Sequence, residues 1–165
     1  MSQLELKEFE NLYRTQASRV RSILFNLGSQ SEVDDLVQEV FIKIWKSYSS
    51  FEGKSSLSTW IYRVTVNTAI DASRKKKFWS FFDMFQGEEG VAKADSTTER
   101  DLVQKGLSKL SEDHRSVLVL SYLEGFSNAE LAEILNISEG TVKSRLHYAK
   151  KEFVETLKKA GVNYE

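Results

Sequence analysis

The sequence predicts an all-α fold of two small helical domains joined by a linker, with a helix-turn-helix in the second domain. The 165 residues include no proline, which favours uninterrupted helices. Apolar residues recur at helical spacing through most of the chain. Residues 78–97 break this pattern, because five aromatic residues in eight are followed by a small, polar and acidic stretch. A chain of this length accommodates two small domains.

Composition excludes several classes of function. The chain has no cysteine, which rules out disulfides, thiolate metal sites and cysteine nucleophiles, and its two histidines leave little for a zinc site or a catalytic triad. No apolar run approaches the roughly 18 residues of a membrane span. The N-terminus lacks the basic and apolar regions of a secretory signal. We therefore expect a soluble, cytoplasmic protein without membrane insertion, catalytic residues, metal or cofactor.

The formal net charge of −1 conceals a segregation of charge along the chain. Residues 54–79 contain six basic side chains and one acidic one, whereas residues 80–139 contain five basic and twelve acidic ones. Residues 140–165 are basic again, with six basic side chains and three acidic ones. Two basic islands separated by acidic segments indicate two contacts with a polyanion. The alternative is that these lysines and arginines are only solvated side chains on exposed helix faces.

Three helices are predicted for the first domain, residues 1–77. The first runs from about residue 4 to residue 27 and stops at Gly28. Ser31 is placed to cap the second helix, whose apolar face extends to Trp45. A loop rich in serine and glycine follows, and a third helix is expected over residues 58–77.

The linker, residues 78–97, begins with five aromatic side chains. Five exposed rings would favour aggregation, so we expect them to be covered by one of the domains or by a partner. Blue-shifted fluorescence from Trp79 is the expected sign of such covering.

The second domain, residues 98–165, contains several helix-capping signals. Thr98 with Asp101 forms a capping box, and Ser111 is placed to cap the next helix, which Gly125 can end. Ser127 with Glu130 then forms a second box.

The strongest functional signal lies in residues 127–151. A helix of about eight residues, a three-residue turn containing Asn136 and a second helix capped by Ser138 match the geometry of a helix-turn-helix. Val142, Leu146 and Ala149 fall on the inner face of the second helix. The outer face then presents donors for bases and phosphates in a major groove, namely Lys143, Ser144, His147, Tyr148 and Lys151. A helical hairpin that merely packs is the alternative.

A second signal lies in residues 53–77, where aromatic, amide and cationic groups alternate: Trp60, Tyr62, Arg63, Asn67, Arg74 and Lys75–Lys77. This mixture suits nucleic acid with unpaired bases, because rings stack on bases and cations hold phosphates. The alternative makes Trp60 a core residue and the lysine run a cation cluster at a helix C-terminus.

A third segment, residues 34–45, is acidic and amphipathic. Its carboxylates, Asp34, Asp35 and Glu39, could in principle ligate a divalent metal for nuclease chemistry. No general base or second ligand cluster accompanies them, so a solvated or partner-binding face is the better interpretation.

Together these segments resemble an extracytoplasmic-function (group IV) sigma factor of the bacterial sigma-70 family, over about residues 5–77 and 98–157. Residues 34–45 resemble the family's region 2.2, residues 51–77 its regions 2.3–2.4, and residues 110–151 its region 4. Two positions depart from the family pattern, since Ser111 stands where proline is usual and Tyr148 where arginine is common.

The resemblance implies a non-enzymatic factor that binds core RNA polymerase and directs it to promoters. By similarity, Asp35, Gln38 and Glu39 contact the clamp helices of the β′ subunit. The −10 element is expected to meet Lys54, Ser55, Ser56, Trp60, Tyr62, Arg63, Asn67, Asp71, Arg74 and Lys75. The −35 element is expected to meet Ser127, Ser138, Thr141, Lys143, Ser144, Arg145, His147, Tyr148 and Lys151. Promoter DNA, the β subunit and an anti-sigma factor are further expected partners.

Two rival functions remain open from the residues alone. A helix-turn-helix regulator that binds duplex DNA explains residues 127–151 equally well, but it leaves residues 34–45 and the row from Trp60 to Arg74 without a role. A metal-dependent nuclease is a more distant alternative. A test of binding to core polymerase distinguishes a sigma factor from the first rival, which never joins polymerase. A test for turnover of DNA with magnesium distinguishes a sigma factor from the nuclease.

Overall fold

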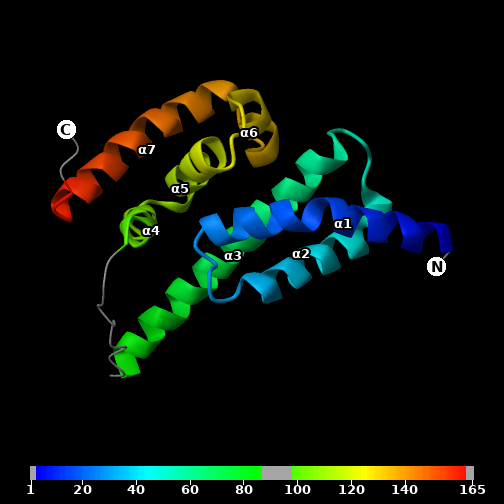
Figure 1. Ribbon diagram of the computed structural model, residues 1–165, viewed down its shortest axis with the longest axis horizontal. Coiled ribbons are helices and arrows are strands. Elements are labelled where there is room, and N and C mark those ends of the chain that lie inside the picture. Colours follow the sequence, from blue (N-terminus) through cyan, green and yellow to red (C-terminus); the bar gives the residue numbers. More distant parts are fainter. Residues whose placement is uncertain (1–2, 87–97, 163–165) are drawn as a thin grey trace.

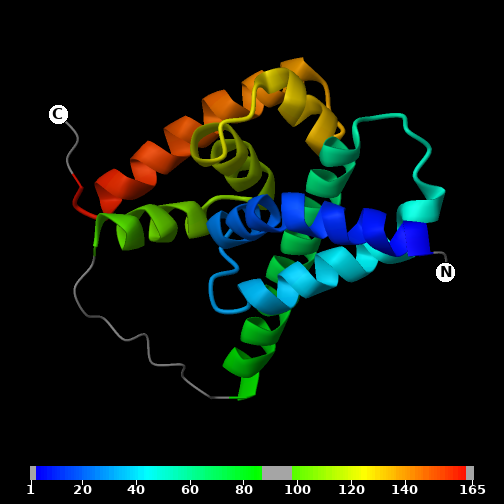
Figure 2. The same ribbon diagram turned by 45° about the vertical axis from the view of Figure 1, so that its right-hand side comes forward.

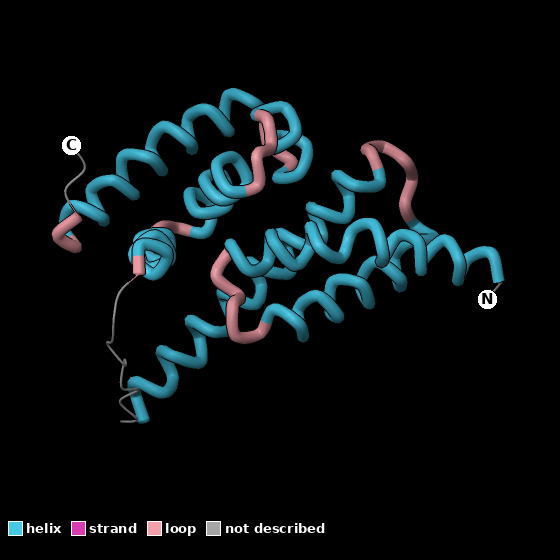
Figure 3. The backbone as a smooth tube through the Cα atoms, in the orientation of Figure 1, coloured by secondary structure: helices cyan, strands magenta, loops and turns pink. Residues whose placement is uncertain are grey.

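The computed structural model describes residues 3–86 and 98–162, and all the regular structure in these residues is helical (Figure 3). The predicted all-α class is therefore confirmed. The α-helices are α1 (Gln3–Asn26), α2 (Val33–Ser47), α3 (Leu57–Gln86), α4 (Glu99–Lys109), α5 (Glu112–Leu118), α6 (Asn128–Leu135) and α7 (Glu139–Lys159). A 3₁₀ turn, η1 (Tyr48–Ser50), follows α2, and a π-helical turn, η2 (Val119–Leu123), follows α5.

Helices α1, α2 and α3 pack against one another as a three-helix group (Figure 1). Val20, Ile23, Ile44 and Ile61 are completely buried between them. Each of the three helices has one apolar face and one polar face, so the group closes a core without strands.

Helices α4 to α7 form the second group, in which α5 and α4 both pack on the long helix α7. Val117, Leu131 and Val142 are fully buried at its centre. Gly106 allows α4 to approach α7 closely, because a Cβ atom at this position would lie 2.7 Å from Cε2 of Phe153. In the view of Figure 1, α6 and the start of α7, which form the helix-turn-helix, lie above α1 and α2.

The two groups are in contact. Helix α6 lies beside α3, and η2 lies against α1 (Figure 2). The buried apolar side chains of both groups form a single cluster.

Two predictions about local structure were wrong. Helix α3 does not end at Lys77 but continues to Gln86, because nothing between these residues stops a helix and the next glycine is Gly87. Ser31 does not cap α2, since the turn from Ser29 to Glu32 places Glu32 at the N-cap position, without a side-chain cap.

The aromatic segment was expected to be covered by a domain or by a partner. Covering by a domain is not found for its first two rings, and covering by a partner stays a prediction. Phe78 and Trp79 lie on the last turns of α3, and the Trp79 side chain is 58% exposed, so neither ring is covered by a domain. The two rings contact each other edge-on, with centroids 5.8 Å apart. The other three aromatic side chains of this segment, Phe81, Phe82 and Phe85, lie outside the described side chains.

Candidate nucleic-acid interface

The helix-turn-helix forms as the capping signals predict. Ser127 accepts a hydrogen bond from the Glu130 N–H at 3.2 Å, while Glu130 accepts one from the Ser127 N–H at 2.7 Å. Asn136 ends α6 in the left-handed conformation, with φ 54° and ψ 49°. Ser138 then caps α7 by accepting from the Thr141 N–H at 3.1 Å. These local contacts set the angle between α6 and α7.

Helix α7 has one buried face and one exposed face. Val142 and Ala149 are fully buried. The predicted outer residues Lys143, Ser144, His147, Tyr148 and Lys151 are all exposed. Their spacing of i, i+1, i+4, i+5 and i+8 places them on one side of the helix. The rings of His147 and Tyr148 meet edge-on at 5.3 Å, and Tyr148 is 60% exposed.

Four other residues assigned to the −35 element have bonds within the domain. The hydroxyls of Ser127 and Ser138 are used as caps, and Thr141 Oγ1 lies 2.8 Å from Ser138 Oγ. Arg145 forms an ion pair with Asp113, with Nη2 and Oδ2 3.0 Å apart. These residues shape the recognition helix. The Ser144 hydroxyl also bonds within the helix, because it donates to the Thr141 carbonyl oxygen at 3.0 Å.

The predicted −10 residues of α3 form a stripe at helical spacing. Arg63, Asn67, Asp71 and Arg74 follow one another at intervals of four, four and three residues, which places them on one side of the helix. Asn67 and Asp71 are exposed. The cations at the two ends are not free, because Arg63 donates to the Glu133 carbonyl oxygen at 2.6 Å and Arg74 lies 3.2 Å from Glu112.

The loop before α3 divides into exposed and structural residues. Lys54 is exposed and forms an ion pair with Glu52. Ser56 caps α3, since its Oγ accepts from the Thr59 N–H at 3.1 Å. Trp60 is partly buried and packs on Phe51 with ring centroids 5.2 Å apart. This geometry matches the alternative interpretation of Trp60 as a core residue.

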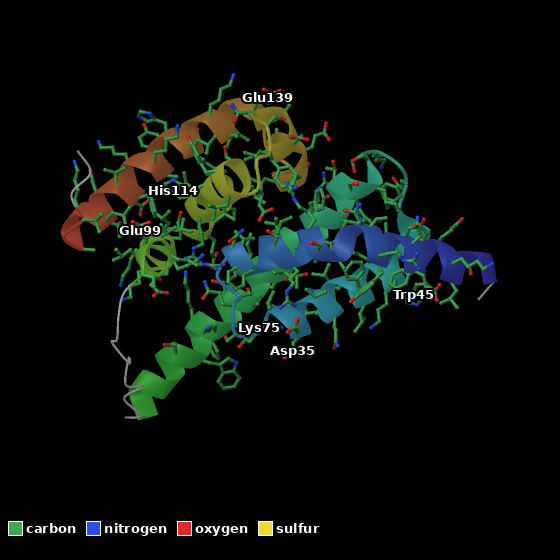
Figure 4. All side chains as sticks on the ribbon, in the orientation of Figure 1. Asp35, Trp45, Lys75, Glu99, His114 and Glu139 are labelled. Atoms are coloured by element: carbon green, nitrogen blue, oxygen red, sulfur yellow. The ribbon has the colours of Figure 1, made fainter. Side chains whose placement is uncertain are left out.

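Helix α2 presents the acidic face predicted for polymerase. Asp35 and Gln38 are exposed, and neither side chain has a partner within the described part of the chain. Glu39 is paired with Lys43 one turn later at 2.8 Å. Figure 4 shows Asp35 and Glu139, the first residue of α7, at opposite edges of the molecule.

Three ionisable groups in the second helical group have shifted pKa values. The hydrogen bond from the Thr98 hydroxyl lowers the pKa of Asp101, and the Ser127 backbone N–H lowers the pKa of Glu130. Burial lowers the pKa of Arg115, although Glu112 partly opposes this effect. The first two shifts follow from hydrogen bonds at helix caps, and the third follows from burial, so none of them indicates catalysis.

Sequence reasoning missed a polar cluster around Glu124. Its side chain is 3% exposed and accepts hydrogen bonds from Ser22 Oγ and Asn26 Nδ2, both at 2.8 Å. The partners are about one hundred residues away in sequence, so no local pattern marks them.

The described residues hold neither a cluster of metal-ligating side chains nor a membrane-spanning helix. Within residues 3–86 and 98–162, no group of three or more metal-ligating side chains is positioned to hold an ion. None of the helices in the same ranges is both long enough and apolar enough to cross a membrane.

Comparison with protein families identifies both helical groups. Residues 12–78 match the model of Sigma-70 region 2, and residues 100–153 match that of Sigma-70 region 4. The ECF RNA polymerase sigma factor SigW of Bacillus subtilis is 38% identical over an alignment of 136 residues, and the match covers 73% of this chain and 73% of the relative. The chain belongs to the ECF sigma factors of the sigma-70 family. It is therefore a transcription initiation factor that directs RNA polymerase to promoters, and not an enzyme.

A further relative and two solved structures agree with this family assignment. The ECF RNA polymerase sigma-E factor of Escherichia coli K12 is 33% identical over 159 residues, covering 87% of this chain and 83% of the relative. Among solved structures, RpoE from Bartonella quintana, in complex with the anti-sigma factor NepR, has a TM-score of 0.71 and 28% identity. That match covers 92% of this chain and 98% of RpoE. CnrH, in complex with the cytosolic domain of CnrY, shares the fold with a TM-score of 0.67 and 22% identity.

Proposed function

We propose that this sigma factor reads its promoter with two separate surfaces and docks on polymerase with a third. The domain of residues 1–77 contacts polymerase and the −10 element, and the domain of residues 98–165 contacts the −35 element. The observation that carries this assignment is the pair of polar, cation-bearing helix faces on α3 and α7, each opposite a buried apolar face. A rigid helix with one face fixed in a core can present its other face in a constant register.

The −35 element is assigned to the outer face of α7. Lys143 and Lys151 supply cations for phosphates, while Ser144, His147 and Tyr148 supply donors and rings for base edges. Arg145 acts here as a positioning residue, through its ion pair with Asp113.

The −10 element is assigned to the stripe on α3 and to the loop before it. Asn67 and Asp71, which are exposed, present amide and carboxylate groups to unpaired bases, and Lys54, Arg63, Arg74 and Lys75 hold phosphates. Extruding a base costs on the order of a few kcal/mol. One small domain can capture an open strand, and polymerase contributes the remaining free energy of melting.

Polymerase is assigned to the exposed acidic face of α2, formed by Asp35, Gln38 and Glu39. Because such a face needs a basic partner, the clamp helices of the β′ subunit fit it, and the β subunit is expected to contact the second domain. The chain is expected to work in the cytoplasm, where polymerase acts. An anti-sigma factor is a further expected partner, since the solved relatives RpoE and CnrH are each bound to another protein.

Run-off transcription with core polymerase tests the division between the two DNA surfaces. Asn67→Ala should reduce transcription from a duplex promoter roughly tenfold, because one stacking or hydrogen-bonding interaction with a base is removed. A template already unpaired over the −10 element should restore most of that activity. Lys143→Ala with His147→Ala should reduce transcription from both templates, by about 1–3 kcal/mol for each base that the variant no longer touches.

A matched control is Lys158→Ala, an exposed lysine near the end of α7, which should leave both templates unaffected. An equal reduction by Asn67→Ala on both templates would exclude a role in strand opening. An unchanged footprint over the −35 element in the Lys143 and His147 variants would exclude the assignment of α7.

A further inference from the structure

A cavity of about 700 Å³ lies between the two helical groups. Its walls come from the loop between α1 and α2, from the second half of α3, and from α4 and α5. The residues assigned above to promoter DNA and to polymerase all lie outside this lining. Sites for small molecules have volumes of about 300–1,000 Å³. The cavity is therefore a candidate binding site separate from those already described.

The lining of this cavity is positively charged. Its cations come from three helices: Lys76 and Lys77 of α3, Lys105 of α4 and Arg115 of α5. The other polar side chains of the lining are serines and glutamines, so no carboxylate of residues 3–86 and 98–162 contributes to it. Cations on converging walls, without carboxylates among them, produce a positive potential that attracts anions.

Arg115 is the most buried of these cations and has hydrogen-bonding capacity to spare. The residue is 8% exposed. Its Nε and Nη2 donate to carbonyl oxygens at the end of α4, whereas Nη1 has no hydrogen bond to any residue that the structure describes. Nη1 is not closed off from solvent, so it remains accessible to a ligand. A guanidinium held in place by its other donors offers a fixed charge and two further N–H groups.

The lysines of the lining are available as well. Within the described parts of the chain, Lys76 and Lys105 form no ion pair. Lys77 shares the carboxylate of Glu112 with Arg74, at 3.7 and 3.2 Å. Glu112 lines an adjoining hollow instead of this cavity. Its single charge is set against the two cations with which it pairs, so the surplus at the cavity stays positive.

The lining also limits the chemistry of a ligand. It contains no aromatic ring from the described residues, so nothing there stacks on a base. The hydroxyl of Ser73 and the amide of Gln104 can donate to phosphate oxygens, as the cations do. A single phosphate would fill a small part of the cavity, whereas a chain of phosphate groups can pair with several of the cations at once.

We propose that this cavity binds a small anion that carries a chain of phosphate groups. Lys76 and Lys77 hold it from the first helical group, and Lys105 and Arg115 hold it from the second. The phosphate chain is the feature that is recognised, and its source is inorganic polyphosphate or a nucleotide. The proposal goes beyond the proposed function, because it does not depend on the assignment of α3 or α7 to DNA.

Isothermal titration calorimetry of the full chain with inorganic tripolyphosphate tests the proposal. The titration is carried out with EDTA and about 0.15 M salt, which screens scattered surface charges beyond about 8 Å. One tripolyphosphate per chain is expected, and the melting temperature should rise with its concentration. Inorganic phosphate should bind about tenfold more weakly or less, because it reaches fewer of the cations.

Variants of the lining identify the site. Lys76→Ala with Lys105→Ala should weaken tripolyphosphate binding by about tenfold or more, because two charge-assisted hydrogen bonds are lost. Gln104→Glu places a carboxylate in the lining at almost unchanged volume and should weaken binding by a similar factor. Lys109→Ala with Lys158→Ala is the matched control, since it removes the same charge from exposed positions outside the lining. The control should bind within about twofold of the unmodified chain. Circular dichroism verifies that each variant is folded.

Titration with adenosine triphosphate identifies the source of the phosphate chain. Tighter binding of adenosine triphosphate than of tripolyphosphate would assign the site to a nucleotide, and equal or weaker binding would assign it to inorganic polyphosphate. Absence of binding by both compounds would overturn the proposal. An equal loss of affinity in the lining variants and in the control would also overturn it, because binding would then depend on net charge alone.

Discussion

Arg115 joins α4 to α5 through three backbone carbonyl groups. Its guanidinium donates to the carbonyl oxygens of Leu107, Ser108 and Leu110, at distances of 2.8 to 3.1 Å. Burial lowers its pKa, but an arginine remains charged in this setting. The planar group thereby supplies donors to carbonyl oxygens at the end of α4, of which that of Leu107 also accepts from the Leu110 N–H at 3.2 Å.

Replacing Arg115 by alanine should lower the free energy of unfolding by about 3 kcal/mol, because buried carbonyl groups lose charge-assisted hydrogen bonds. Urea denaturation followed by circular dichroism measures this change. Lys109→Ala is the control, since Lys109 is exposed at the end of α4, next to the carbonyl groups that Arg115 bonds, and it should alter stability by less than about 0.5 kcal/mol. Equal stability of the two variants would contradict the structural role of Arg115.

The residues that sequence predicted well are those whose partners are near in the chain. Ser127 and Ser138 each bond to an N–H three positions later, and Asn136 ends a helix by its own conformation. Arg115 and Glu124 could not be identified in this way, because an arginine or glutamate in a polar sequence is expected at the surface until the packing is known.

At the scale of an element, the start of α6 depends on the ionised Glu130. Because its pKa is lowered in the folded state, the charge contributes stability above the ordinary glutamate pKa, about 4.3, and that contribution is lost as pH falls through the folded value. Glu130→Gln should therefore lower stability at pH 7 by less than about 1 kcal/mol, since the site is exposed.

The difference between Glu130→Gln and the unmodified chain should shrink as pH falls below 4. Urea denaturation of both chains at pH 7 and at pH 3 measures it. A difference of the same size at both values would exclude the charge as the cause.

The end of α3 is a second feature at this scale. Sequence reasoning took the change from basic to aromatic residues as a boundary, but composition does not stop a helix when glycine and proline are absent. Trp79 consequently lies on the same rigid helix as the −10 stripe. It also lines a surface hollow with Leu36 and Glu39 of α2, beside the proposed polymerase face.

Trp79 should therefore emit as a solvent-exposed tryptophan in the free chain and shift to the blue when core polymerase binds. Fluorescence of a variant that lacks Trp45 and Trp60 isolates this signal. Quenching by iodide should be strong before binding and weak afterwards. Unchanged emission and quenching in the complex would show that Trp79 lies outside the polymerase interface.

At the scale of the whole molecule, two helical groups were predicted from sequence, whereas their contact was not. Hydrophobic periodicity identifies each helix and its buried face, and the helix-turn-helix follows from local caps. The packing of α6 on α3 depends on residues far apart, among them Arg63 with Glu133 and Tyr62 with Phe126. The segregation of charge along the sequence predicted contact with DNA. The structure adds that some of these opposite charges pair within the chain, as Arg74 and Lys77 do with Glu112.

The central claim is that the acidic face of α2 binds core polymerase. It is tested most directly by measuring the affinity for core polymerase of a chain that carries both Asp35→Arg and Glu39→Arg. Reversing two charges on the exposed acidic face of α2 should abolish binding, a loss of at least a hundredfold, while circular dichroism remains unchanged. Glu8→Arg with Glu10→Arg, on the exposed part of α1, is the matched control and should bind normally. Binding of the α2 variant within twofold of the unmodified chain would contradict the account.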